Sequence, residues 1–369
     1  MALPRCHFLF NGLGAGNIGD EAMFAGFNRL FRMAPGSTVE VYDERAPILR
    51  TLPDAFEYLT WTDPSRTDDA IRAAEVVLLV GDTLVSELHG VAWPLLPIGE
   101  RVGRAIELGK TVHGVAIGVD RLTTADSRAV FAEYHAHLAT WTTRSEACRA
   151  ALIDLGVAPD RITAAADLAW LCPTGVECPD PRAAALGEEP IVAVNIVGED
   201  WAADDARTLA LARALDRAAE ELKLRLAFVC NETRRHPVYD YDTACRLADH
   251  MRSQPILVDP SYVTPGQQIS LLRRCRAVVS QRYHLGLMGV LAQRPVGLFD
   301  RGQKLVQLAA EISAPSLGPH DVIDEERVLT ALEELLSDGA EIVARQQAAR
   351  ERLTKRLCDN AGRFLRRPG

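Results

Sequence analysis

Short apolar and β-branched runs alternate with stretches of helical periodicity along almost the whole chain. This alternation is typical of parallel β-sheets whose strands are joined by crossover helices, so it predicts an α/β fold. In the first half the predicted strands are residues 8–10, 39–42, 76–80, 111–115, 140–142 and 162–164. In the second half they are residues 191–196, 226–229, 256–258, 277–279 and 296–299.

Residues that break helices and strands separate the two halves. Residues 171–190 concentrate prolines and glycines, which suits a connection between domains. We therefore predict an N-terminal α/β domain over residues 1–175 and a C-terminal α/β domain over residues 190–340. Residues 341–369 are predicted to form a C-terminal helix. Two Rossmann-like domains of ordinary size account for a chain of 369 residues.

A glycine-dense turn, residues 12–22, lies between an apolar run and an amphipathic helix. Glycine lets the backbone approach a ligand closely, and the N–H groups at a helix N-terminus favour an anion. The turn therefore predicts part of a ligand cleft that includes Asp20. The other residues expected there are Gly14, Gly16, Asn17, Gly19 and Glu21.

Residues 14–19 also fit the G-x-G-x-x-G pattern of dinucleotide-binding proteins. That interpretation needs an acidic residue after the second strand, and Glu40 or Asp43 could serve. Asp20 and Glu21 argue against it, because these carboxylates would face a pyrophosphate with like charge. An NAD-dependent enzyme stays an alternative, but we expect no cofactor.

The composition narrows the range of partners. A net charge of −9 disfavours nucleic acid, and the eight cysteines form no metal-binding spacing, so we expect no metal. No apolar run approaches the roughly 20 residues that span a bilayer, so no integral membrane segment is expected. The N-terminus lacks the succession of basic, apolar and small residues that is typical of a signal peptide, which indicates a cytoplasmic protein. A homo-oligomer is compatible with these properties.

A second candidate loop, Ser280-Gln-Arg-Tyr-His284, follows the predicted strand 277–279 and precedes an apolar helix. Arg282 offers a planar fork for a carboxylate or phosphate, and His284 can move a proton near neutral pH. The alternative is that Arg282 caps a neighbouring group and His284 is an ordinary first-turn residue. If the first interpretation holds, the ligand lies in the cleft where the carboxyl ends of the two sheets meet.

These segments together resemble the polysaccharide pyruvyl transferase family. The resemblance rests on Asn17-Ile-Gly-Asp-Glu-Ala22, on Ser280-Gln-Arg-Tyr-His284, and on the downstream Pro295 and Lys304. Arg144 lies in a segment similar to an arginine-containing segment of that family, and Ala166-Asp-Leu-Ala169 resembles another. The order and spacing of these motifs extend over most of the chain.

The resemblance implies a GT-B-like fold and transfer of a pyruvyl group from phosphoenolpyruvate to a sugar or glycan during polysaccharide biosynthesis. Phosphoenolpyruvate carries a carboxylate and a phosphate, so its site needs at least two cationic groups. His284 is the expected general acid, with Asp20 or Glu21 as a base or acceptor-hydroxyl ligand. The residues expected to bind the donor are Arg282, Arg144, Lys304 and Ser280.

One segment departs from the family pattern. The family usually shows a run of glycines after the third strand, whereas residues 81–89 here read Gly-Asp-Thr-Leu-Val-Ser-Glu-Leu-His. Two alternatives therefore stay open. One is a GT-B-like glycosyltransferase that uses a nucleotide sugar, and the other is a non-catalytic binding protein of the same fold.

Overall fold

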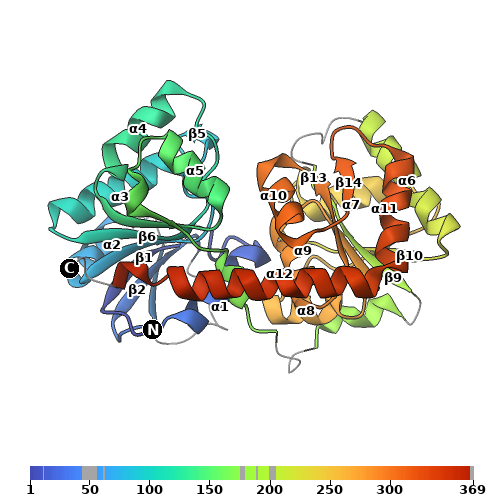
Figure 1. Cartoon of the computed structure of the whole chain (residues 1–369), viewed down its shortest axis with the longest axis horizontal. Coiled ribbons are helices and arrows are strands. Elements are labelled where there is room, and N and C mark those ends of the chain that lie inside the picture. The colour runs from blue at the N-terminus through green and yellow to red at the C-terminus, as the bar shows by residue number, and fades with distance from the viewer. Residues whose placement is uncertain are drawn as a thin grey trace. The chain divides into compact units, whose positions relative to one another are not determined.

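The computed structural model describes residues 1–10, 12–43, 56–60, 63–174, 179–187, 190–198 and 205–365. The chain forms two compact units (Figure 1). Unit 1 comprises Met1–Ala15, Asp20–Cys172 and Leu353–Gly369. Unit 2 comprises Gly16–Gly19 and Pro173–Arg352, so four residues of the glycine turn group with the second unit.

Unit 1 contains a seven-stranded parallel sheet of order β3-β2-β1-β4-β6-β7-β8. Its strands are β1 (Cys6–Leu9), β2 (Ser37–Val41), β3 (Phe56–Thr60), β4 (Val76–Val80), β6 (Thr111–Ile117), β7 (Leu138–Thr143) and β8 (Ile162–Ala164). A short strand, β5 (Leu88–Val91), lies outside this sheet. The helices are α1 (Ile18–Leu30), α2 (Pro64–Ala73), α3 (Leu95–Glu107), α4 (Ala125–His135) and α5 (Glu146–Asp154).

In the unit 1 sheet, strands are added first on one side of β1 and then on the other. β2 and β3 lie on one side of β1, and β4 and its successors lie on the other. In open parallel sheets such a switch point leaves a crevice at the carboxyl ends of the two strands, where ligands bind. Here the switch point lies between β1 and β4.

Unit 2 contains a six-stranded parallel sheet of order β11-β10-β9-β12-β13-β14. Its strands are β9 (Ile191–Asn195), β10 (Arg225–Phe228), β11 (Ile256–Leu257), β12 (Ala277–Ser280), β13 (Val296–Asp300) and β14 (Ser316–Pro319). The helices are α6 (Asp205–Glu221), α7 (Asp240–Ala248), α8 (Pro265–Leu272), α9 (Tyr283–Leu291), α10 (Gly302–Ile312) and α11 (Glu325–Ser337). The last helix, α12 (Gly339–Asn360), begins in unit 2, and its residues from Leu353 onward group with unit 1. The switch point of this sheet falls between β9 and β12.

Helix α9 shows how packing in the unit 2 core positions candidate functional residues. Every residue of α9 is buried, as expected for a helix that is apolar on all sides. A Cβ at Gly289 would lie 2.7 Å from Val296 Cγ2 and 3.1 Å from Val278 Cβ, so glycine permits close packing on β12 and β13. The start of α9 is thereby fixed at the carboxyl end of β12.

The predicted α/β class with two parallel sheets is confirmed, and each predicted strand is present, with unchanged ends for β4 and β8 and shifted ends for the others. The pattern missed β3, β5 and β14. β14, Ser-Leu-Gly-Pro, is an edge strand whose glycine and proline conceal it, because both residues are depleted in strands. Residues 175–178 and 188–189 of the predicted linker lie outside the described residues. Within the described ranges, no helix combines the length and apolarity needed to cross a bilayer.

Candidate functional site

The carboxyl edge of the unit 2 sheet gathers polar residues from several loops. β9 ends at Asn195, β12 ends at Ser280, and these strands pair in parallel at the switch point. Gln281 joins their loops, because its N–H donates to Asn195 O (3.1 Å) and its Oε1 accepts from Val197 N (2.9 Å). The topology therefore places a candidate ligand site at this edge.

Ser280 fixes the backbone of the following loop. Its Oγ accepts from Arg282 N at 2.9 Å and donates to Arg282 O at 2.8 Å. Such local side-chain bonds favour turns and helix starts, and Arg282 is the N-cap residue of α9. The hydroxyl thus sets the position from which the guanidinium extends.

Asp240, the first residue of α7, connects these loops. Its side chain is 1% exposed, and its Oδ1 accepts from Arg282 Nε (3.0 Å) and Nη2 (2.9 Å). Its Oδ2 accepts from Asn195 Nδ2 (2.8 Å), Asn231 N (2.8 Å) and Glu232 N (3.1 Å). A buried charge is tolerated only when it is paired and hydrogen-bonded, and this carboxylate meets both conditions.

The segment Gly16–Gly19 packs on the loop that follows β10. Ile18 N donates to Asn231 O (2.9 Å), and Thr233 N donates to Gly16 O (2.8 Å). Asn17 Oδ1 accepts from Asn231 Nδ2 (2.8 Å) and from Gly19 N (2.9 Å). This part of the glycine turn is therefore held by backbone pairing with unit 2 residues.

His284 lies directly against Gly19. A Cβ at Gly19 would overlap the His284 ring, so the residue at position 19 has to be glycine for the imidazole to keep its place. The His284 side chain is nearly buried and packs edge-on against the Tyr283 ring at 5.2 Å. The structure thus brings two sequence-predicted residues, 265 positions apart in the chain, into contact within unit 2.

Lys304 and the basic loop after β10 supply further positively charged side chains. Lys304 lies in the first turn of α10, after the carboxyl end of β13, which pairs in parallel with β12. Arg234 bonds to Glu232 through Nε (2.9 Å) and Nη2 (2.8 Å) and lies over the Tyr239 ring. Arg235 is paired with Asp242. The charge of this basic loop is therefore compensated locally.

Arg144 lies at the carboxyl edge of the unit 1 sheet. It follows β7 and is 6% exposed, and its Nη2 donates to Thr83 Oγ1 at 3.1 Å. A Cβ at Gly118 would lie 2.6 Å from Arg144 Cζ, so the glycine after β6 makes room for the guanidinium. The segment after β4, which departs from the family pattern, thus supplies a contact to Arg144.

Glu87 explains another part of that departing segment. Its carboxylate accepts from the N–H and Oγ1 groups of Thr123 and Thr124, at 2.7–3.0 Å. These bonds hold the pKa of Glu87 well below its usual range, and the bond from the Thr123 hydroxyl has the largest effect. Glu87 therefore secures the start of α4, because Thr124 is the N-cap of that helix.

Asp20 and Glu21 fold back onto the first half of the glycine turn. A Cβ at Gly12 would overlap the Asp20 carboxylate, and Glu21 Oε1 accepts from Gly14 N at 3.3 Å. Burial raises the pKa of Glu21 to about 8, against the opposing effect of the Gly14 N–H. Glu21 Oε2 is buried without a hydrogen-bond partner. An anion at Gly12–Gly14 would thus meet two carboxyl groups.

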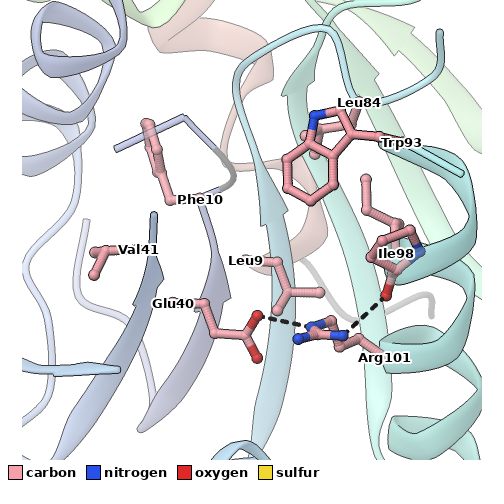
Figure 2. Close-up of a pocket in the computed structure, with 9 residues that line it drawn as sticks. Leu9, Phe10, Glu40, Val41, Leu84, Trp93, Ile98 and Arg101 are labelled. Carbon is pink, nitrogen blue, oxygen red and sulfur yellow. Dashed lines mark hydrogen bonds and ion pairs between the residues drawn. The ribbon is translucent and has the colours of Figure 1, made fainter. Parts of the chain in front are cut away.

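A pocket opens at the carboxyl ends of β1 and β2 in unit 1 (Figure 2). Glu40 lies in it, and its carboxylate accepts from Arg101 Nε (2.8 Å) and contacts His7 Nε2 (3.3 Å). Burial would raise the pKa of Glu40, but His7 and Arg101 together hold it below its usual value. This carboxylate, an expected ribose ligand in the dinucleotide interpretation, is thus engaged within the protein.

The expected site residues divide between the two units. Unit 2 holds Gly16, Asn17, Gly19, Ser280, Arg282, His284 and Lys304, and unit 1 holds Gly14, Asp20, Glu21 and Arg144. Sequence reasoning missed Asp240 and Asn231, which organise the unit 2 edge. Asn231 lies three residues after the end of β10, and its place in a loop at a strand's carboxyl end is the kind of position that revealed Arg282. Asp240 lies far from any predicted strand end. No cluster of three or more metal-ligating side chains occurs among the described residues.

Comparison with known proteins extends these observations. The family model described as "Polysaccharide pyruvyl transferase" matches residues 17–302. No protein of curated function matches the sequence.

Solved structures match nearly the whole chain. HepE of Anabaena in complex with UDP-glucose has 12% identity and a TM-score of 0.65, over 98% of this chain and 99% of that chain. The UDP-GlcNAc 2-epimerase of Methanocaldococcus jannaschii has 11% identity and a TM-score of 0.64, over 96% and 99%. A glycosyltransferase of Rickettsia africae has 11% identity and a TM-score of 0.61, over 98% and 99%. At this identity the similarity shows the fold, and the GT-B-like expectation is confirmed.

Proposed function

Because the chain belongs to the polysaccharide pyruvyl transferase family, we propose that it moves the pyruvyl group of phosphoenolpyruvate onto a sugar or glycan acceptor, forming a ketal. The observation that carries this proposal is the unit 2 edge, where Ser280 and Asp240 fix Arg282 two residues before His284 at the start of α9. A fixed guanidinium and an imidazole at one helix start suit a donor that must be held by its charge and protonated.

The roles follow from the chemistry of the donor. Arg282, whose backbone Ser280 holds in place, and Lys304 bind its carboxylate and phosphate. His284 donates a proton to C3 of the enol ether, which makes C2 electrophilic. A sugar hydroxyl adds to C2 and releases its proton to a base. Inorganic phosphate then leaves, a second hydroxyl adds to C2, and its proton passes to the released phosphate as the ketal closes.

Two variants separate binding from turnover. His284→Ala should keep affinity for phosphoenolpyruvate and lose about a hundredfold to ten-thousandfold in rate, the usual contribution of a positioned general acid. Arg282→Ala should weaken donor affinity itself, because an arginine fork binds through a permanent charge. The measurements are calorimetric titration with phosphoenolpyruvate and phosphate release with a glycan acceptor.

Matched controls lie elsewhere in unit 2. Arg276 is exposed at the amino end of β12, opposite Arg282, and His250 is exposed after α7. Alanine at either position should leave affinity and rate unchanged. A His284→Ala enzyme that works at the wild-type rate would move the general acid elsewhere. Binding of UDP-glucose without any response to phosphoenolpyruvate would instead favour a nucleotide-sugar enzyme.

A further inference from the structure

Helix α7 carries a guanidinium that the described part of the chain leaves unsatisfied. Arg246 lies in the last turn of α7 and is partly buried. Its Nε and Nη2 atoms are shielded from solvent, and neither has a hydrogen-bond partner among the described residues. Shielded polar and charged groups are costly unless a partner satisfies them. The guanidinium is therefore available to an anion that binds from solution.

Thr243 supplies a second buried donor one turn earlier on the same face of α7. Its side chain is 2% exposed, and within the described ranges its Oγ1 atom also has no hydrogen-bond partner. A Cβ at Gly198 would lie 2.6 Å from Thr243 Oγ1 and 3.0 Å from Arg246 Nη2. Both polar atoms therefore converge on one glycine, which leaves the space beside them free of a side chain. We call Arg246 and Thr243 the α7 donor pair.

The topology places the α7 donor pair where a ligand is expected. Gly198 lies three residues beyond the carboxyl end of β9, which borders the switch point of the unit 2 sheet. The backbone at this point is fixed, because Gly198 N donates to Val238 O (3.1 Å) in the segment before α7. The position is thus evidence for a binding site that does not depend on the unsatisfied atoms.

The charges at this place favour an anion with strong acceptor atoms. Arg282 is paired with the Asp240 carboxylate, whereas no carboxylate of the described residues pairs with Arg246. An anion at Arg246 would therefore replace no ion pair. A guanidinium and a hydroxyl are both donors, and a phosphate group offers several oxygens that accept from them.

We propose that the α7 donor pair binds the phosphate of a glycosyl phosphate, so that the acceptor of the transfer is a sugar attached to a phosphate-bearing carrier. This inference rests on the proposed function, in which Arg282 and Lys304 bind the two anionic groups of phosphoenolpyruvate. Arg246 then serves a third anionic group, and the acceptor is the substrate that supplies it.

The test is calorimetric titration of the wild-type protein with three glycosyl phosphates: glucose 1-phosphate, UDP-glucose and a farnesyl diphosphate-linked glucose. At least one should bind, whereas neutral methyl glucoside should not. The three probes share the phosphate and differ in the carrier, so their affinities distinguish a free sugar phosphate, a nucleotide and a lipid as its source. Inorganic phosphate is titrated alongside them and should bind more weakly.

Two variants examine the α7 donor pair directly. Arg246→Met keeps the apolar stem and removes the charge, so it should weaken binding of the glycosyl phosphate at least about tenfold. Thr243→Val keeps the shape and removes the hydroxyl, which should cost at least about threefold. Arg252→Met is the matched control, because Arg252 is exposed just beyond the end of α7. In turnover assays Arg246→Met should raise the KM for the acceptor and leave the KM for phosphoenolpyruvate unchanged.

Thermal unfolding distinguishes a binding role from a structural one. Without ligand, Arg246→Met should keep or raise the Tm, because it removes a shielded charge that has no partner. Added glycosyl phosphate should raise the Tm of the wild type and leave that of Arg246→Met unchanged. A variant that unfolds at a lower Tm or does not fold would show that the guanidinium is satisfied within the protein, which would overturn the inference.

Three other results would also overturn it: no glycosyl phosphate binds, both α7 variants bind as tightly as the wild type, or inorganic phosphate binds as tightly as the glycosyl phosphates. In the last case the α7 donor pair takes the released product and not the acceptor. Failure of the proposed function looks different, because phosphoenolpyruvate would then not bind, while binding of the glycosyl phosphate would still depend on Arg246.

Discussion

The carboxyl edges of the two sheets share one topology and differ in chemistry. In unit 2 a buried carboxylate, Asp240, accepts five hydrogen bonds and fixes an arginine at a helix start. In unit 1 the corresponding edge is an aromatic and aliphatic pocket whose Glu40–Arg101 pair compensates itself. A parallel sheet determines where a ligand can bind, but the loops determine which ligand binds.

The unit 2 edge suits the anionic donor of the proposed transfer. An anionic donor needs cations whose position is fixed in advance, because ordering them during binding costs affinity. Each unit can thus be examined separately by substitutions at its own edge.

The largest effect is expected from Asp240→Ala. The substitution leaves the largely buried Arg282 guanidinium, whose side chain is 16% exposed, without its carboxylate partner. Breaking a buried pair costs about 3–5 kcal/mol, so the free energy of unfolding should fall by that amount in urea denaturation. Asp242→Ala is the control: Asp242 pairs with the exposed Arg235, and its loss should cost less than about 1 kcal/mol. Equal losses would show that Asp240 does not organise this edge.

The second prediction compares two buried glutamates of unit 1. The pKa of Glu21 is raised to about 8, so between pH 4.5 and 8 the folded protein keeps a proton that the unfolded chain loses. Stability should therefore fall as pH rises, by up to about 1.4 kcal/mol per pH unit. Glu21→Gln stays neutral, so its advantage in Tm over the wild type should grow from pH 4.5 to pH 8.

Glu40 provides the opposite control. Its pKa is lowered, so its contribution to stability is present above the unfolded pKa and is lost as pH falls through the folded value. Glu40→Gln should thus be most destabilising near neutral pH and less so in acid. Parallel pH profiles for the two variants would contradict these assignments.

Much of the fold followed from the sequence, because period-2 and period-3.6 patterns report local structure directly. The motif around Ser280 also revealed that Arg282 and His284 follow a strand. The contact of Gly19 with His284 could not be derived, since residues so distant in the chain meet only through tertiary packing. Asp240 was missed for the same reason. Its importance comes from five bonds to groups on other elements, and no local pattern records them.

Gly19→Ala tests that long-range contact. The added methyl group overlaps the His284 ring, and forcing extra volume into a packed site typically costs about 1–3 kcal/mol. The imidazole should shift, so turnover should fall at least about tenfold while affinity for phosphoenolpyruvate changes little. Gly103→Ala is the control, because a Cβ at this position of α3 meets no atom within 4 Å. That variant should be neutral or slightly stabilising. A fully active Gly19→Ala enzyme would show that the position of His284 does not depend on glycine at residue 19.

The smallest effect is expected from Arg235→Ala in the basic loop after β10. Arg235 is 60% exposed, pairs with Asp242 and lies over the Tyr241 ring at 4.6 Å. Exposed ion pairs contribute little to stability because water screens them, so the free energy of unfolding should hardly change. Because its charge is compensated on the surface, the affinity for phosphoenolpyruvate should also stay within about twofold of the wild type in calorimetric titration. A large loss of donor affinity would place this loop in the anion site and would weaken the assignment of that site to Arg282 and Lys304.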